Sequence, residues 1–419
     1  MSRRGRSLRF LGVVVCCLGA LSHGALWSEG SGQEVLAATR FVPHDNDEEP
    51  MSRLAVDVPQ ISLAPYVWKL TGAGPTARAE ATMPGAYLKV AFQGSSSIVL
   101  FVDGTANNGC PPAAMPVVDH SVDEGPFKSV QLETTGEVYV LPLAAGLERS
   151  AAHRLELHLR AACLGPNRWQ DSTVHLRIAG IGLEQGGSLL DCPQRPKRAI
   201  GFGDSITEGV CNEGSCPYYS NLLMNNARTT WFPLVCAGLS CEYGQLGTGG
   251  QGLVRPIEIP PLPQTWDHYD AATSRLTGEL LLPEPDYVFC AMGTNDFRET
   301  AGHREQIDIT DAYTDWLAAV RKACPKTLCF CVVPPLGWHA TEIAAAVAAR
   351  NQAGDDKVHL IDTAPLKAAF SDSHGTQLAP DGVHPSVYGN AMLATLIAVE
   401  VQKILDRQWS VYFIGRTAS

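Results

Sequence analysis

The sequence lacks three features, and each absence excludes a class of protein. No apolar run reaches the roughly 20 residues that span a bilayer; the one marked run, Phe10–Leu21, has 12 residues. Positive charge is not in excess, because 43 acidic residues face 32 basic ones and the formal net charge is −11. Around Cys329 and Cys331 there is no histidine or cysteine pair at zinc spacing. We therefore expect no stable membrane insertion, no nucleic-acid partner and no metal site.

The first 25 residues are typical of a secretory signal peptide. Arginines at positions 3, 4, 6 and 9 flank or precede the apolar run, and the small-residue stretch SHGA follows it. We predict that residues 1–25 are removed and that the mature protein is secreted; a short signal anchor that stays attached is the alternative. Residues 26–58 are acidic and poor in periodic pattern, which predicts a flexible lead-in or pro-segment.

Cysteine usage fits an exported protein without defining its disulfides. Of the 13 cysteines, two lie in the predicted signal peptide, so 11 remain. Export favours disulfides, and close spacing suggests three local pairs: Cys211/Cys216, Cys236/Cys241 and Cys324/Cys329. Connectivity does not follow from sequence. Because the number is odd, at least one thiol is unpaired or joins another chain.

Two regions of different texture predict two domains. Residues 59–190 carry short alternating runs such as AYLKVAF, SSIVLFVDG and HRLELHLRA, separated by Gly, Pro and Asp. Alternation with a period of two, interrupted by turn residues, predicts an antiparallel β-sandwich of the jelly-roll type. A linker, Asp191–Arg198, then leads into residues 198–410.

Residues 198–410 predict an α/β domain. Apolar strands (AIGFG, CEYGQL, DYVFCAMG, TLCFCVV and VHLID) alternate with helical patterns near 229–239, 311–324, 341–351 and 386–407. This alternation predicts a parallel sheet with helices on both faces. Ligands bind such sheets at the carboxyl ends of the strands. Polar clusters fall there: GDSIT, GTGGQG and GTND each follow a strand, and DGVHP opens the last helix.

These clusters hold the parts of a nucleophilic site. Ser205 in GDSIT is the candidate nucleophile, His384 the base that takes its proton, and Asp381 the acid that orients the imidazole. The N–H groups of Ser205 and Gly250 and the side-chain amide of Asn295 are candidate oxyanion donors. The alternative is that Ser205 is only a turn residue between a strand and a helix.

Four of these short motifs resemble the conserved blocks of a known hydrolase family. GDSIT, the glycine of GGQG, GTND and DGVH resemble blocks I, II, III and V of the SGNH/GDSL hydrolases. The resemblance assigns Ser205, Gly250, Asn295 and His384 to the four residues that name the family and Asp381 to the triad acid. A jelly roll followed by such a domain resembles carbohydrate esterase family two, whose members remove acetyl groups from plant-type polysaccharides. No metal or organic cofactor is implied.

The resulting hypothesis is a secreted serine esterase that hydrolyses small acyl esters, acetyl above all, on carbohydrate. A general short-chain carboxylesterase or lipase, or a glycan-binding protein with an esterase-like fold, are the alternatives. Trp338 either stacks on a sugar ring or fills a loop core, and Arg255 either steers a substrate carboxylate or lies in a surface salt bridge. Asp204 and Asp296 are expected to hold turns. The sugar, the oligomeric state and the role of the β-domain stay open.

Overall fold

A computed structural model describes residues 51–133, 135–163, 168–170, 175–215, 221–255, 259–275, 284–300, 303–372 and 375–417, with side chains up to residue 407. The predicted signal peptide, residues 26–50 of the predicted lead-in and Cys216 lie outside the described residues. Across the described part of the chain, no helix is long and apolar enough to cross a membrane.

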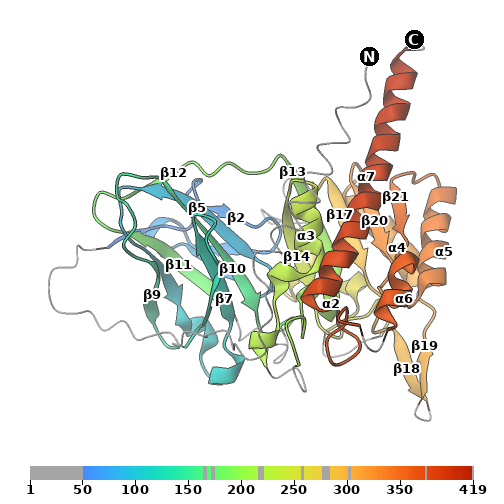
Figure 1. The fold of residues 1–419 in the computed structure, drawn as a ribbon, viewed down its shortest axis with the longest axis horizontal. Helices are drawn as coiled ribbons and strands as arrows, with labels where there is room; N and C mark the ends of the chain where they lie inside the picture. The colour runs from blue at the N-terminus through green and yellow to red at the C-terminus, as the bar shows by residue number, and fades with distance from the viewer. Residues whose placement is uncertain are drawn as a thin grey trace.

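The N-terminal half of the described chain is a sandwich of two antiparallel sheets (Figure 1). The first has the order β3 (Lys69–Thr71), β4 (Arg78–Ala81), β11 (Leu176–Leu183), β6 (Ile98–Asp103) and β9 (Val138–Ala144), and β1 (Ser52–Leu54) also pairs with β11. The second has the order β12 (Ser188–Leu190), β5 (Tyr87–Gln93), β10 (His153–Ala161), β7 (Val117–Val122) and β8 (Lys128–Gln131), and β2 (Ser62–Leu63) also pairs with β5.

The alternation seen in the sequence builds the core of this sandwich. In β10, Leu155, Leu157 and Leu159 are at most 1% exposed, and they belong to the same apolar cluster as Leu100 of β6 and Ile178 of β11. Such burial of every second residue is what joins two pleated sheets face to face. Strand β1 falls within residues 26–58, which were predicted as a flexible lead-in. Its three residues instead pair with β11 and form part of the sandwich.

The C-terminal half is a five-stranded parallel sheet with helices on both faces. Its order is β14 (Cys241–Gly247), β13 (Lys197–Gly203), β17 (Tyr287–Ala291), β20 (Leu328–Val332) and β21 (Val358–Ile361). The helices are α2 (Ser205–Glu208), α3 (Trp231–Gly238), α4 (Thr310–Ala323), α5 (Ala340–Gln352), α6 (Lys367–Phe370) and α7 (Val387–Thr417). The predicted fold class, an SGNH-type α/β sheet preceded by an antiparallel sandwich, is confirmed.

Shorter elements connect these layers. Two hairpins are β15 (His268–Asp270) with β16 (Thr273–Ser274) and β18 (Phe297–Thr300) with β19 (His303–Gln306). The 3-10 helices are η1 (Gly74–Thr76), η2 (Gly104–Asn107), η3 (Pro112–Ala114), η5 (Leu222–Met224), η6 (Ala227–Thr229), η7 (Leu262–Gln264) and η9 (Ala364–Leu366). Helix α7 continues ten residues past its predicted end at 407, since no Gly or Pro interrupts the sequence before Gly415.

The sandwich covers the edge of the parallel sheet. Glu242 on the edge strand β14 accepts hydrogen bonds from the hydroxyl of Tyr87 and from Lys89 Nζ, the latter at 3.1 Å, both on β5. Figure 1 shows the sandwich lying beside β14 and β13. An uncovered edge strand is a template for unwanted pairing, so this contact protects the sheet on that side.

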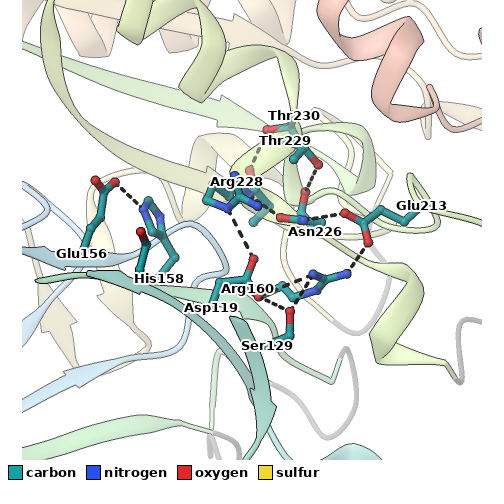
Figure 2. A network of polar contacts seen from close by, with 12 residues as sticks. Asp119, Ser129, Glu156, His158, Arg160, Glu213, Asn226, Arg228, Thr229 and Thr230 are labelled. Atoms are coloured by element: carbon teal, nitrogen blue, oxygen red, sulfur yellow. Dashed lines mark hydrogen bonds and ion pairs between the residues drawn. The ribbon is translucent and has the colours of Figure 1, made fainter. Parts of the chain in front are cut away.

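A second contact between the two halves is a buried polar network around Asp119 (Figure 2). Asp119 of β7 is fully buried and accepts from Ser129 Oγ at 2.6 Å, from Arg160 Nη1 at 3.4 Å and from Arg228 Nε at 3.3 Å. Arg160 of β10 also forms an ion pair with Glu213. The sandwich therefore holds the loop that follows α2 by charge-assisted hydrogen bonds.

Candidate active site

Ser205 stands at the carboxyl end of β13, as the first residue of the four-residue helix α2. Asp204 caps this helix, because its Oδ1 accepts the N–H of Ile206 at 2.9 Å. The side chain of Asp204 is fully buried, and burial raises its pKa to about 6. The expectation that Asp204 holds the turn is confirmed by this hydrogen bond.

The chain brings three of the predicted residues into one hydrogen-bonded line. The Nε2 of His384 lies 2.8 Å from Ser205 Oγ, although the two residues are 179 positions apart. The Nδ1 of His384 lies 2.6 Å from Asp381 Oδ2. When Nδ1 carries the ring proton it donates to Asp381, and Nε2 is then free to accept the Ser205 proton. His384 is only 2% exposed, so water does not compete for these contacts.

Asp381 is held as a carboxylate. Partial burial opposes its ionisation, but hydrogen bonds from the His384 ring and from the N–H groups of Val383 and His384 outweigh it, and the pKa of Asp381 falls below its usual 3.8. The two N–H groups bond Oδ1 at 2.9 and 3.0 Å, which leaves Oδ2 for the ring. One carboxylate thus shapes its own loop and fixes the imidazole.

The predicted oxyanion residues lie on two loops that contact each other. Gly250 follows β14 and has a φ of 76°, a conformation that favours glycine. Asn295 follows β17, and its Nδ2 donates to the carbonyl of Gln251 at 3.0 Å. An amide nitrogen carries two N–H groups, so this bond orients the Asn295 side chain while leaving a second donor. The neighbouring Gly249 N–H is used differently, since it donates to Glu208 Oε2 at 2.6 Å.

Asp296 clamps these two loops together. Its Oδ2 accepts the N–H of Leu253 at 2.9 Å, and its Oδ1 accepts those of Val254 at 2.9 Å and Arg255 at 3.1 Å. The carboxylate is fully buried, and three backbone N–H groups occupy its oxygens. It therefore has a structural role rather than a catalytic one. The expected structural role of Asp296 is confirmed by these bonds.

The two remaining predicted residues have different settings. The Arg255 guanidinium lies 4.1 Å from the centre of the Phe297 ring, and its Nη1 donates to the Asn295 carbonyl at 3.4 Å. Among the described residues, no carboxylate pairs with the Arg255 guanidinium. Trp338 is half-buried in the loop between β20 and α5. Beside it, His339 Nε2 lies 3.0 Å from the carbonyl of Asp296, which ties this loop to the site.

Two further groups lie near the site. Arg168 Nη2 donates to Glu208 Oε1 at 2.5 Å, and both side chains are at most 3% exposed. Cys211 Sγ and ligand atoms of Asp381 and His384 lie within 4.8 Å of one another. Cys211 is disulfide-bonded and is therefore not a thiolate ligand for a metal. The pair of Arg168 with Glu208 joins residues 40 positions apart, which no local pattern in the sequence reveals.

The other two suggested disulfides are not formed. Cys236, Cys241, Cys324 and Cys329 are all free and buried, as are Cys290 and Cys331. In each suggested pair the first cysteine lies at or near the end of a helix and the second on the following strand. A disulfide requires Cβ atoms about 4 Å apart and facing each other, and closeness in sequence does not supply this geometry.

Comparison with known proteins agrees with the geometry. Residues 202–392, which hold all five residues of the predicted triad and oxyanion hole, match the GDSL-like lipase/acylhydrolase family. The predicted resemblance to the SGNH/GDSL hydrolases is therefore confirmed for this part of the chain. This match agrees with the predicted type of enzyme, a GDSL-type carboxylic ester hydrolase.

Two curated esterases resemble this chain over about two thirds of its length. The chain is 24% identical over 295 residues to the cellulase/esterase CelE of Acetivibrio thermocellus, a match that covers 68% of this chain and 34% of that protein. It thus spans about a third of CelE's length. It is 22% identical over 310 residues to an acetylxylan esterase/glucomannan deacetylase of Cellvibrio japonicus, covering 69% of this chain and 76% of that protein.

Solved structures share the whole two-domain architecture. A family two carbohydrate esterase from Cellvibrio japonicus aligns with a TM-score of 0.67 at 18% identity, covering 86% of this chain and 99% of that one. An acetyl xylan esterase from Butyrivibrio proteoclasticus aligns with a TM-score of 0.66 at 17% identity, covering 85% and 99%. The predicted resemblance to carbohydrate esterase family two is confirmed as a likeness of fold.

Proposed function

We propose that this protein is a secreted serine esterase that removes small acyl groups, acetyl above all, from carbohydrate. The observation that carries the proposal is the line Ser205–His384–Asp381, with distances of 2.8 and 2.6 Å, at the carboxyl ends of the sheet. A buried serine bonded to an imidazole that is itself bonded to a carboxylate is the arrangement of an activated nucleophile. The names of the relatives, acetylxylan esterase and glucomannan deacetylase among them, support the substrate class.

The proposed reaction proceeds through an acyl-enzyme. Ser205 Oγ attacks the ester carbonyl carbon while His384 Nε2 takes the hydroxyl proton, and the carbonyl electron pair moves onto oxygen. The N–H groups of Ser205 and Gly250 and the Asn295 amide stabilise that oxyanion. Collapse of the tetrahedral intermediate breaks the bond between the carbonyl carbon and the sugar oxygen. The sugar oxygen then leaves with the proton from His384. Water, deprotonated by His384, then releases acetate and restores Ser205.

Asp381 sets the direction of each proton transfer in this scheme. By accepting a hydrogen bond from Nδ1–H, Asp381 favours the tautomer in which Nε2 carries no proton and can accept that of Ser205. The carboxylate also stabilises the imidazolium that then forms. A Ser205-to-imidazole contact without this carboxylate would leave the ring free to rotate or to adopt the wrong tautomer.

Hydrolysis of p-nitrophenyl esters from acetyl to octanoyl by the purified chain lacking residues 1–25 tests the chemistry. We expect activity confined to short acyl groups, and a loss of about 10⁴-fold or more in kcat for Ser205→Ala. Ser150→Ala, on the exposed surface of the sandwich, is the matched control and should behave like the wild type. Near-native turnover by Ser205→Ala would exclude Ser205 as nucleophile.

Acetate release from acetylated xylan and glucomannan tests the substrate class separately. Free acetate in the wild type but not in Ser205→Ala supports a carbohydrate deacetylase. Rates that rise with acyl chain length, without acetate from either polymer, would instead favour the general carboxylesterase or lipase. An inactive wild type that binds these polymers tightly would favour a glycan-binding protein.

A further inference from the structure

A small cavity lies between the sandwich and the GDSL domain, beside the loop that carries Gly250. Its wall includes Thr248 and Gln251 from that loop, and Trp169 and Arg168 from the sandwich side. Arg275, which follows the β15–β16 hairpin, completes it. The cavity volume is about 30 Å³, which is room for about two water molecules or one small ion. Neither Ser205 nor His384 lines it, so it is a separate site.

Arg275 is a buried cation that forms no ion pair with a carboxylate of the described residues. Its side chain is 0% exposed, and its hydrogen bond is to the backbone carbonyl of Tyr66. Its Nε has no hydrogen-bond partner, and within the described ranges no carboxylate forms an ion pair with the guanidinium. Burial lowers the pKa of Arg275 to about 10, so the group still carries its charge at neutral pH. Buried charges in proteins are otherwise paired, because leaving water costs several kcal/mol.

Arg168 lines the same cavity and also has an unsatisfied N–H. Its Nη2 and Nη1 donate to Glu208 and to the carbonyl of Thr82, at 2.5 and 3.3 Å, but its buried Nε has no partner. Both oxygens of Glu208 are engaged, Oε1 by Arg168 and Oε2 by the N–H of Gly249 at 2.6 Å, and Glu208 forms no ion pair with Arg275.

The remaining acids near the cavity are also engaged. Asp267 bonds His268 Nδ1 at 2.7 Å, and Asp270 bonds Lys69 Nζ at 3.1 Å. Asp270 and Asp267 favour the charged form of Arg275, but neither side chain forms an ion pair with its guanidinium. The cavity therefore has the size of a small-ion site, and it is lined by two buried guanidinium groups that each have an unsatisfied N–H.

We propose that this cavity binds one small monovalent anion, a halide or a short carboxylate, between Arg275 and Arg168. Chloride and acetate share the charge and fit the volume, whereas a sugar ring does not. The bound ion would satisfy both unpartnered Nε–H groups and neutralise Arg275. Because Thr248 and Gln251 flank Gly250, it would also stabilise the loop that carries this predicted oxyanion donor. Acetate is the product of the proposed reaction, but the site itself does not depend on that reaction.

Thermal unfolding at constant ionic strength tests the proposal, with sodium gluconate, whose anion is too large for the cavity, replaced stepwise by sodium chloride or sodium acetate. The wild type should show a saturable rise in Tm of at least about 2 °C with one or both ions. Arg275→Met should lose this response, whereas Arg149→Met, which removes an exposed arginine of the sandwich, should retain it. The lower half-saturating concentration identifies the preferred ion.

Crystals grown in sodium bromide give a measurement that needs no variant. Anomalous scattering should place one bromide ion within about 3.5 Å of a nitrogen of Arg275. Only water in the cavity, together with a Tm that is independent of the small anions, would overturn the proposal. Both measurements can be repeated on Ser205→Ala, so failure of the proposed esterase function would not be mistaken for failure of this site.

Discussion

A single carboxylate, that of Asp381, serves both the local backbone and the catalytic ring. Its Oδ1 accepts two backbone N–H groups, and its Oδ2 accepts from the His384 ring at 2.6 Å. The spacing of three residues between the aspartate and the histidine makes this possible, because the turn between them folds the ring back over the carboxylate. The sequence motif DGVH therefore encodes a geometry as well as two residue types.

Replacing Asp381 by asparagine should reduce kcat on the order of 10⁴-fold with little change in KM, because the amide can bond the wrong ring tautomer. Steady-state kinetics on p-nitrophenyl acetate measure this. A drop in kcat below tenfold would mean that the carboxylate only shapes the loop. Val383→Ala, which keeps both backbone hydrogen bonds, is the control and should stay close to the wild type.

The stability of the fold should depend on this same ionisation. The pKa of Asp381 is lower in the folded state than its ordinary 3.8, so its contribution is full above that ordinary value and is lost as the pH falls through the folded-state pKa. We expect Asp381→Asn to unfold at lower urea concentration than the wild type at pH 7, and the gap to narrow below pH 4. A gap that is unchanged or wider at pH 3 would contradict this.

At the scale of elements, the site depends on how closely the loop after β14 approaches α2. Gly247, the last residue of β14, lies against the backbone of Glu208 at the end of α2, where a Cβ would be closer to the Glu208 nitrogen than real Cβ atoms come. Glu208 in turn accepts the N–H of Gly249, one residue before Gly250. The position of the predicted oxyanion loop relative to Ser205 is thus set by a close backbone contact.

Gly247→Ala should therefore destabilise the fold by about 1–3 kcal/mol, the usual cost of overpacking, and lower kcat as the loop moves away from α2. Urea unfolding followed by fluorescence gives the free energy. Gly238→Ala is a matched control, because the nearest atom to its new Cβ would be Ala398 Cβ at 3.9 Å. That variant should be neutral or slightly stabilising. Equal stabilities for the two variants would show that the contact is not tight.

At the scale of the whole molecule, the sandwich acts on the site through the network around Arg160. Arg160 donates to the carbonyl of Asn225 at 3.0 Å, and Asn225 Oδ1 accepts the N–H of Cys211 at 2.7 Å. Cys211 packs beside Asp381 and His384. A chain of contacts therefore runs from β10 of the sandwich to the triad, and the sandwich supports the site as well as covering the sheet edge.

Arg160→Met should cost about 3 kcal/mol or more, because it leaves buried polar partners without their cation (Figure 2). The exposed pair between Lys197 and Asp286 provides the comparison, since Lys197→Met should cost less than about 1 kcal/mol. Urea unfolding of both variants measures the difference. A cost for Arg160→Met as small as that of Lys197→Met would mean that the network around Asp119 contributes little to holding the two halves together.

The reactivity of the free cysteine thiols can also be predicted for the molecule as a whole. Burial raises the pKa of Cys241 to about 12 and that of Cys324 to about 11, so few thiolates exist at neutral pH. In the chain without residues 1–25, Ellman's reagent should find at most three accessible thiols in the native state, those of Cys110, Cys163 and Cys192, and nine after denaturation. Five or seven thiols after denaturation would instead indicate further disulfides.

The sequence by itself was enough to predict the two domains' architecture and the residues of the candidate site. Alternation in the sandwich and apolar strands between helices reflect burial, which is written locally along the chain. Four short motifs at strand ends are likewise local, so Ser205, Gly250, Asn295 and His384 could be named before their positions in space were known. The end of α7 was missed, since no residue in the sequence stops that helix before Gly415.

Only the tertiary structure decided which distant groups meet. Examples are the pairing of Arg168 with Glu208, the buried network of Asp119, the free state of nine cysteines, and the lack of an ion pair for buried Arg275 within the described residues. Each depends on contacts between segments far apart in the chain. Sequence spacing determines the energies of neighbours along a helix or strand. The energies of buried charges depend instead on what the fold places within a few ångströms, and that is known only when the chain has folded.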